Sequence, residues 1–469
     1  MLLDKTILEL SAGLRKGEFT ATDIIEECYR NIENFDPKIN AFITTVPKEE
    51  ALKKAKEADQ KLKTSVSKLL GIPFVLKDCY VTQGIPTTAA SNVLKGFISP
   101  YNATVYQKLL DAGAILIGKM NMDAWGHGGS SENTDFGPVK NPWDTTRVAG
   151  GSSGGPAAAI ATRMAVFAIG EDTGGSIRNP SSWCNITGLK VTYGRVSRYG
   201  AIAYASSFDS VGPMAKTAQD CAIILETIAG HDHYDATSSP QSVPPYSQIL
   251  DKSISGVTVG IPTEFYGDGL DSEIKSTILK MSQDFEKIGI KTKEISMPLF
   301  DLCIPVYYLV GPSETSANLA RYDGIRYGND RTNFTDETIR RILIGTYALS
   351  AGYYDAYYKK AQQVRTLFIE EYNKALSECD ILLQPVMPTP PTKIGELLTD
   401  PLKNLLADIY TVSQNPVGVP SLALPCGFTK TGLPIGAQLV GSMFSEDLLL
   451  ALGYQFQQLT DYHLAKPKL

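Results

Sequence analysis

Histidine is scarce in this sequence. Four histidines occur among 469 residues, and only His231 and His233 stand close together. Zinc sites in proteins take three or four ligands at characteristic spacings, which these histidines do not offer. We therefore predict no metal centre. A nucleophile that depends on a histidine base would also find few candidates for that base.

Long apolar runs and paired cysteines are absent too. No stretch approaches the roughly 20 apolar residues of a membrane-spanning helix, and the first ten residues resemble a helix rather than a signal peptide. The seven cysteines are scattered without a Cys-x-x-Cys pair, which predicts buried thiols in a reducing compartment such as the cytoplasm. The net charge of −6 at pH 7 argues against broad contact of this chain with nucleic-acid phosphates.

Short apolar segments alternate with amphipathic segments along the chain. The predicted helices are two within 3–34, then 47–62, 104–112, 156–163, 216–229, 271–288 and 333–377. The predicted strands are 71–76, 114–118, 164–169, 256–261, 380–384, 421–426 and 435–440. This alternation predicts an α/β fold in which helices cover both faces of a central sheet.

No linker or internal repeat divides the chain. We therefore expect one large domain over residues 1–469. Its N-terminal helices would lie in 1–65 and a catalytic core in 66–215. The remainder of the sheet, further helices and the C-terminal strands would lie in 216–469.

Glycine and serine gather in two loops, Gly-Gly-Ser-Ser-Gly-Gly at 150–155 and Asp-Thr-Gly-Gly-Ser-Ile-Arg at 172–178. Pro156 and Pro180 follow, and proline favours the first position of a helix. Both loops are therefore expected to lead into helix N-termini, where free N–H groups stabilise a developing negative charge. The alternative for either loop is a turn in which serine only caps a helix.

A serine nucleophile needs a base, and two lysines follow apolar strands. Lys77 ends Phe-Val-Leu-Lys, and Lys119 ends Leu-Ile-Gly-Lys. Burial can lower the pKa of a lysine, and a neutral amine near pH 7 requires a shift of about three units, or roughly 4 kcal/mol. Either lysine could instead extend its amine to water from a strand end. The residues alone do not choose between the two lysines.

The loop around Ser152 also matches the Gly-x-Ser-x-Gly pattern of an α/β-hydrolase nucleophile elbow. That elbow requires a buried strand directly before it, and residues 141–149 make a poor one. Its base would have to be His231, His233 or His463, which all lie in polar, turn-like surroundings. We therefore favour a lysine base.

The two loops, followed by Gly-Leu-Lys-Val-Thr-Tyr-Gly-Arg-Val-Ser at 188–197, resemble the signature of the amidase signature family. The resemblance extends over essentially the whole chain. It implies a mixed-sheet α/β fold and a Ser-Ser-Lys triad. In that triad Ser176 is the nucleophile, Ser152 relays the proton after a cis peptide bond, and Lys77 is the base.

The same resemblance assigns the oxyanion hole and leaves one lysine outside the triad. The backbone amides of Thr173, Gly174, Gly175 and Ser176 would bind the oxyanion. Lys119 would be a structural residue at a strand end.

Within the family, three stretches resemble the A subunits of the tRNA-dependent amidotransferases: 321–328, 345–360 and 415–427. This narrower resemblance implies that glutamine is held by Tyr307, Arg341 and Asp408. An arginine suits the α-carboxylate of glutamine and an acid suits its α-ammonium group. The neighbouring residues Tyr308 and Arg340 are the alternatives for the first two positions.

The implied activity is hydrolysis of glutamine to supply ammonia for converting Glu-tRNA(Gln), and Asp-tRNA(Asn), to the amidated forms. No cofactor is expected in this chain. ATP, Mg²⁺ and misacylated tRNA would belong to a partner, the B subunit of the amidotransferase, and a small C subunit would complete a cytoplasmic heterotrimer. The alternatives are a stand-alone amidase acting on another carboxamide and a non-catalytic scaffold.

Overall fold

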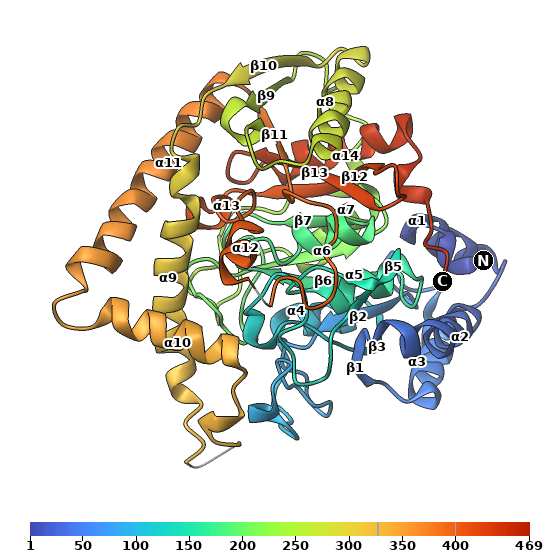
Figure 1. Cartoon of the computed structure of the whole chain (residues 1–469). Coiled ribbons are helices and arrows are strands. Elements are labelled where there is room, and N and C mark those ends of the chain that lie inside the picture. The colour runs from blue at the N-terminus through green and yellow to red at the C-terminus, as the bar shows by residue number, and fades with distance from the viewer. Residues whose placement is uncertain (326–327, 399) are drawn as a thin grey trace.

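A mixed sheet runs through the whole protein, as the computed structural model shows (Figure 1). The structure describes residues 1–325, 328–398 and 400–469, so Arg326 and Tyr327 of the stretch 321–328 lie outside the described residues. Among these residues eleven strands pair in the order β1-β3-β2-β6-β8-β7-β12-β13-β11-β9-β10. Their bounds are β1 Phe42–Thr45, β2 Pro73–Lys77, β3 Ile115–Met120, β6 Phe167–Asp172, β7 Thr187–Lys190, β8 Ser210–Ala215, β9 Thr258–Pro262, β10 Lys291–Ile295, β11 Ile381–Pro385, β12 Ser421–Phe428 and β13 Pro434–Gly441.

The sheet combines both strand directions, which confirms the mixed α/β fold. Strand β2 is parallel to β3 and β6, whereas β6, β8, β7, β12, β13 and β11 follow one another antiparallel. Strands β2, β3 and β6 are buried along their whole length. Their continuous apolar runs fit a sheet that is covered on both faces. A separate pair, β4 Lys140–Asn141 and β5 Asp144–Val148, lies outside this sheet.

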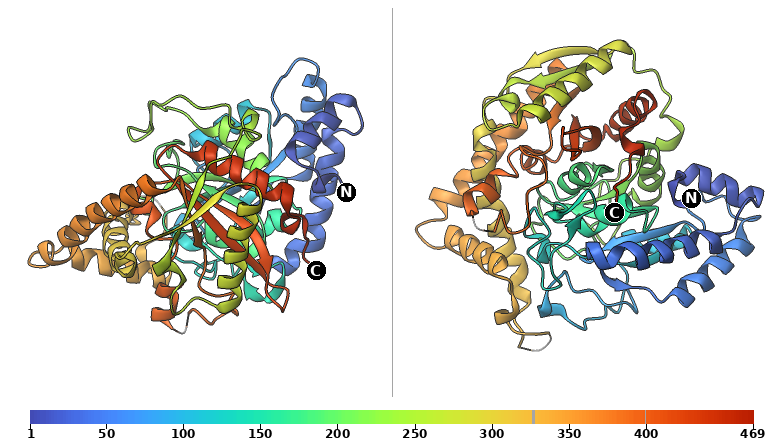
Figure 2. Two further views of the ribbon diagram at one scale, coloured as in Figure 1. Left: turned by 90° about the horizontal axis from the view of Figure 1, so that it is seen from above. Right: turned by 45° about the vertical axis from the view of Figure 1, so that its right-hand side comes forward.

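Helices flank the sheet, and the N-terminal ones pack at one end of the molecule (Figures 1 and 2). The helix bounds are α1 Ile7–Lys16, α2 Ala21–Ile39, α3 Lys48–Lys61, α4 Thr104–Asp111, α5 Gly154–Ala161, α6 Arg178–Cys184, α7 Ala218–Ile228, α8 Ser272–Lys287, α9 Cys303–Asn318, α10 Asp336–Leu349, α11 Lys360–Glu378, α12 Pro401–Leu406, α13 Gln414–Val417 and α14 Glu446–Leu459. Among the described residues, none of these helices is long and apolar enough to cross a membrane.

Helices α9, α10 and α11 extend from the side of the sheet as a protrusion (Figure 1). The prediction of one continuous helix over 333–377 is wrong, because the chain breaks between α10 and α11. Ser350 ends α10 in an extended conformation, and Gly352 has a φ of +85°. A glycine in the left-handed region ends a helix without steric cost.

Helices α5 and α6 begin two residues before the predicted proline positions. Pro156 and Pro180 are each the third helical residue and not the first. The N–H groups of the first turn lack partners inside the helix, so proline is tolerated there as well. Both serine loops still lead directly into helix N-termini, as predicted.

Several elements carry too weak a pattern to be predicted. Strand β10 is mostly exposed and polar, and β8 contains a glycine and a proline. The elements that sequence patterns missed are β1, β4, β5, β7, β8, β10, α9, α12, α13 and α14. The seven cysteines, by contrast, are free and buried, as predicted.

Candidate active site

The two serine loops meet beside the middle of the sheet. The loop that follows β6 presents Ser176, and the N–H of Ser153 donates a hydrogen bond of 3.1 Å to the Ser176 carbonyl. This bond places Ser152 next to the Ser176 loop. The peptide bond between Gly151 and Ser152 is cis. Ser176 is 6% exposed and therefore largely buried.

Lys77 lies at the end of β2 and is fully buried. Its Nζ donates to Ser152 Oγ at 2.7 Å, to the Glu171 carbonyl at 3.1 Å and to Glu171 Oε2 at 2.8 Å. The parallel pairing of β2 with β6 brings these residues together. Lys77 and Ser152 are therefore in direct contact, with an acidic side chain on the same amine.

The charge state of Lys77 differs from the expectation of an amine that burial makes neutral. Burial does lower the pKa of Lys77, but the carboxylate of Glu171, together with Cys79 and Asp123, raises it above its ordinary value on balance. An opposite charge at hydrogen-bond distance favours the charged form of a group. The resting amine is therefore protonated.

Lys119 makes a different set of contacts. It lies in β3 and is fully buried, but its Nζ pairs with Asp78 Oδ1 at 2.8 Å and donates to Thr87 Oγ1 at 2.8 Å. A buried ion pair of this kind fixes the loop after β2. The structure thus places Lys77, and not Lys119, in contact with Ser152.

The Ser176 loop is shaped by the carboxylate of Asp172. Asp172 Oδ1 accepts from the Gly175 N–H at 2.8 Å, and Oδ2 accepts from the Ile177 N–H at 3.0 Å. The Gly175 amide is therefore directed at Asp172 and not at a substrate oxygen. This corrects the expectation for Gly175, and the amides of Thr173, Gly174 and Ser176 remain predicted oxyanion donors.

Asp172 is in turn held by Arg178, and both side chains are fully buried. Arg178 Nε and Nη2 bind the two carboxylate oxygens at 3.0 and 2.9 Å. The same guanidinium donates to Gln414, Gln438 and Asn415 at 2.8 to 3.0 Å. Burial raises the pKa of Asp172, but the guanidinium of Arg178 brings it well below its usual range. The pair ties the Ser176 loop to the C-terminal part of the chain.

Two tyrosines of α9 face the loop. A β-carbon on Gly174 would collide with the ring of Tyr307, so the ring packs directly on this part of the loop. Tyr308 Oη donates to Asp408 Oδ2 at 2.7 Å. Burial raises the pKa of Asp408 to about 6. Tyr307 and Asp408 thus lie on the same side of the loop, with Tyr308 as an additional wall residue.

The two arginines of α10 share Glu337 but differ in burial. Arg341 is 3% exposed, and its guanidinium lies 5.5 Å from the ring centre of Tyr204 and 5.2 Å from that of Tyr308. Arg340 is exposed and pairs with Glu337, which also accepts from Arg341 Nε at 2.9 Å. Arg341 is therefore the arginine that reaches the buried tyrosine cluster.

Two acidic residues near the base were missed by sequence reasoning. Glu171 belongs to the buried strand β6, and Asp209 precedes β8. Both are buried, at 3% and 4% exposure. An acidic residue at the end of a buried apolar strand predicts a nearby polar or charged partner, because a buried carboxyl group requires one.

Two of the four histidines have hydrogen-bond partners outside the serine loops. His127 lies between Thr315 and Thr338, and His231 contacts Ser238. The strand before the Gly150 loop, β5, belongs to the separate two-stranded sheet and is largely unburied. The α/β-hydrolase alternative therefore lacks the central-sheet strand that its nucleophile elbow requires.

Comparison with known proteins identifies the family that this fold and site define. The family model described as "Amidase" matches residues 23–450. The chain therefore belongs to the amidase family.

The similar proteins carry a more specific name. The A subunit of glutamyl-tRNA(Gln) amidotransferase from Chromohalobacter salexigens is 47% identical, covering 99% of this chain and 98% of the relative. The protein of the same name from Coxiella burnetii is 48% identical over 99% of each chain. The crystal structure of the glutamyl-tRNA(Gln) amidotransferase A subunit from Thermotoga maritima has a TM-score of 0.85 and 35% identity, covering 100% of this chain and 98% of that one.

Proposed function

We propose that this protein is the glutamine-hydrolysing subunit of a tRNA-dependent amidotransferase. The observation that carries the proposal is the contact of Lys77 with Ser152 beside the Ser176 loop. A serine with a lysine base and a row of backbone amides can perform acyl transfer. Relatives named as amidotransferase A subunits match over nearly the whole chain.

The proposed reaction proceeds through an acyl-enzyme. Lys77, as a neutral amine, takes a proton from Ser152 while Ser152 takes the proton of Ser176. Ser176 Oγ then attacks the side-chain amide carbon of glutamine, and the amides of Thr173, Gly174 and Ser176 stabilise the oxyanion. The proton returns through Ser152 to the leaving nitrogen, ammonia departs, and water hydrolyses the glutamyl ester.

Glutamine is proposed to be held by Tyr307, Arg341 and Asp408. Arg341 is charged and buried, which suits the α-carboxylate. Asp408 supplies a negative charge for the α-ammonium group above its pKa of about 6. The ring of Tyr307 forms the wall beside Gly174.

The remaining parts of the reaction belong to partners in this proposal. The ammonia would serve a B subunit that binds ATP, Mg²⁺ and misacylated Glu-tRNA(Gln) or Asp-tRNA(Asn), with a C subunit completing a cytoplasmic heterotrimer. The name that the relatives carry supports a complex of several subunits.

Labelling tests the nucleophile. The purified chain is incubated with a glutamine-derived chloroketone and analysed by peptide mass spectrometry. We expect one adduct, on Ser176, and protection by excess glutamine. Labelling of a cysteine with Ser176 unmodified would contradict the assignment, and the seven buried thiols are expected to stay unlabelled.

Replacement of Arg341 tests the substrate. We expect Arg341→Met to lower kcat/KM for glutamine by about 10²- to 10³-fold, because a charge pair with the α-carboxylate is lost. Hydrolysis of an uncharged primary amide should change less than about threefold. The matched control is Arg340→Met, on the exposed face of the same helix, which should leave both rates unchanged. Equal losses for both substrates would favour a stand-alone amidase.

A further inference from the structure

Two carboxyl groups beside the base have no part in the proposed reaction. Glu171 Oε2 lies 2.8 Å from Lys77 Nζ, and its other oxygen, Oε1, accepts from the Thr173 hydroxyl. The same hydroxyl lies 2.8 Å from Asp209 Oδ1. Asp209 also accepts from the backbone N–H groups of Tyr204 and Ala205 at 3.1 and 3.0 Å. The result is a continuous chain of hydrogen bonds from the amine to Asp209.

The Thr173 hydroxyl carries a single proton but contacts two carboxyl groups. It can donate to one of them only, so both contacts are hydrogen bonds only while the other carboxyl group is protonated and donates to the hydroxyl oxygen. Burial and the neighbouring carboxylate of Glu171 raise the pKa of Asp209 to about 8. Below that pH, Asp209 donates to Thr173 and Thr173 donates to Glu171.

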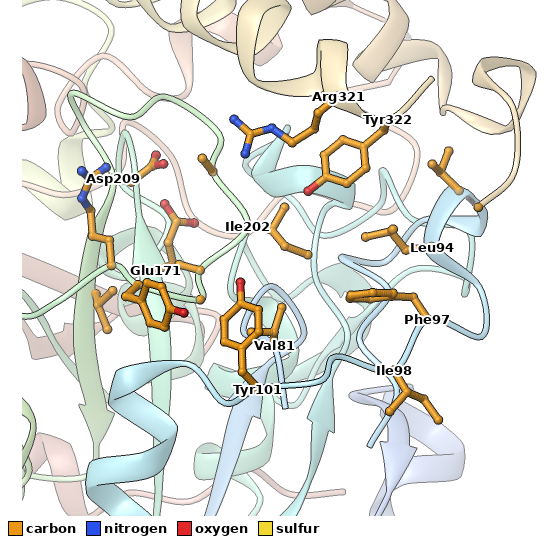
Figure 3. Close-up of a pocket in the computed structure, with 18 of the residues that line it drawn as sticks. Val81, Leu94, Phe97, Ile98, Tyr101, Glu171, Ile202, Asp209, Arg321 and Tyr322 are labelled. Carbon is orange, nitrogen blue, oxygen red and sulfur yellow. The ribbon is translucent and has the colours of Figure 1, made fainter. Parts of the chain in front are cut away.

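The chain of hydrogen bonds ends at a cavity. Glu171 and Asp209 both line a cavity of about 890 Å³, which is otherwise bounded by largely apolar and aromatic side chains such as Phe97 and Tyr101. Figure 3 shows the two acids near each other at one side of this cavity. Among the described lining residues neither Ser152 nor Ser176 occurs. Glu171 and Asp209 therefore line a cavity that is distinct from the space between Lys77 and the two serines.

We propose that Glu171, Thr173 and Asp209 form a proton-holding chain that sets the pH at which Lys77 becomes a neutral base. The proposal rests on the role of Lys77 in the proposed function. Glu171 holds Lys77 as an ammonium ion in the resting enzyme, and the cavity connects the chain to solvent. Protons can thus leave the base without crossing the substrate site. Glu171 and Asp209 are positioning residues, because they act through Lys77.

Other ionisable groups also face this chain. Cys79 and Asp123 lie near Lys77, on the segments that follow β2 and β3. The charge of Arg198 favours ionisation of Asp209, and the hydroxyl of Tyr80 donates to the Gly170 carbonyl at 2.7 Å. Of these groups, Glu171 is the one whose carboxylate contacts the amine.

The pH dependence of Ser176 labelling in the full chain tests the proposal. Removing the Glu171 charge leaves burial to dominate, so the pKa of Lys77 falls. The labelling rate should fall at low pH as Lys77 becomes protonated, and we call this part of the pH profile the acidic limb. We expect Glu171→Gln to move the acidic limb to lower pH by about 1 to 3 units. Glu171→Asp keeps the charge and should restore the wild-type position. A limb at the wild-type position in Glu171→Gln, or a folded variant that is unreactive at every pH, would overturn the proposal.

A second variant covers the case in which Glu171→Gln does not fold. Asp209→Asn removes a negative charge that is present above about pH 8. It should therefore move the limb in the same direction by a smaller amount, and an unmoved limb again overturns the proposal. Absence of labelling in the wild-type chain would instead contradict the proposed function, so the two failures are distinguishable.

Discussion

Replacing Ser176 by alanine is expected to lower glutamine hydrolysis by at least about 10⁴-fold while the chain stays folded. In the proposed mechanism the Ser176 oxygen forms the ester, and loss of a nucleophile removes the whole covalent route. The oxyanion donors and the glutamine contacts remain in place, so binding should persist. Turnover is measured as ammonia release, and glutamine binding by calorimetry.

Substitutions of the neighbouring serines distinguish a catalytic role of Ser176 from a structural one. Ser153 donates to the Glu171 carbonyl at 3.2 Å and is the residue before α5. Ser153→Ala removes that one hydrogen bond and should cost less than about tenfold. Ser152→Ala should approach the effect of Ser176→Ala, because it interrupts the path to Lys77. Turnover of Ser176→Ala within about tenfold of wild type would remove Ser176 as the nucleophile.

The largest effect on stability is expected at Arg178. Arg178→Met leaves the Asp172 carboxylate buried without its partner, and breaking a buried ion pair costs about 3 to 5 kcal/mol. The variant should unfold at a much lower denaturant concentration, with the slope of the transition preserved. Urea unfolding followed by circular dichroism measures the change.

Two further variants test whether the buried charge of Asp172 causes the loss of stability in Arg178→Met. Lys359→Met breaks an exposed pair with Asp355 and should leave the unfolding midpoint unchanged. Combining Asp172→Asn with Arg178→Met removes the orphaned charge, so the double variant should be more stable than Arg178→Met alone. A single Arg178→Met variant as stable as the wild type would contradict the interpretation of this pair.

Sequence patterns predicted the fold class because the inner strands are short, continuous apolar runs. Strands β2, β3 and β6 were found at their approximate positions for that reason. Exposed strands such as β10 have no such pattern, since only burial imposes one. The break between α10 and α11 was missed because only a few residues, with Ser350 extended and Gly352 at positive φ, interrupt an otherwise helical stretch.

The site was predictable where chemistry needs particular residue types at particular spacings. The two serine loops and Lys77 were found in this way, and the structure brings Lys77 and Ser152 into contact. The charge on Lys77 was not predictable, because it depends on Glu171, which is 94 residues away in sequence. The same holds for the Gly175 amide, whose direction is decided by the fold of the loop around Asp172.

The contacts of Arg178 also have a consequence for folding during translation. Its partners Gln414, Asn415 and Gln438 are translated long after it, at separations of 236, 237 and 260 residues. Strands β12 and β13, which complete the middle of the sheet, come from the same late part of the chain. We therefore expect the Ser176 loop to acquire its final shape only near the end of synthesis, and a chain truncated before Gln414 to be inactive.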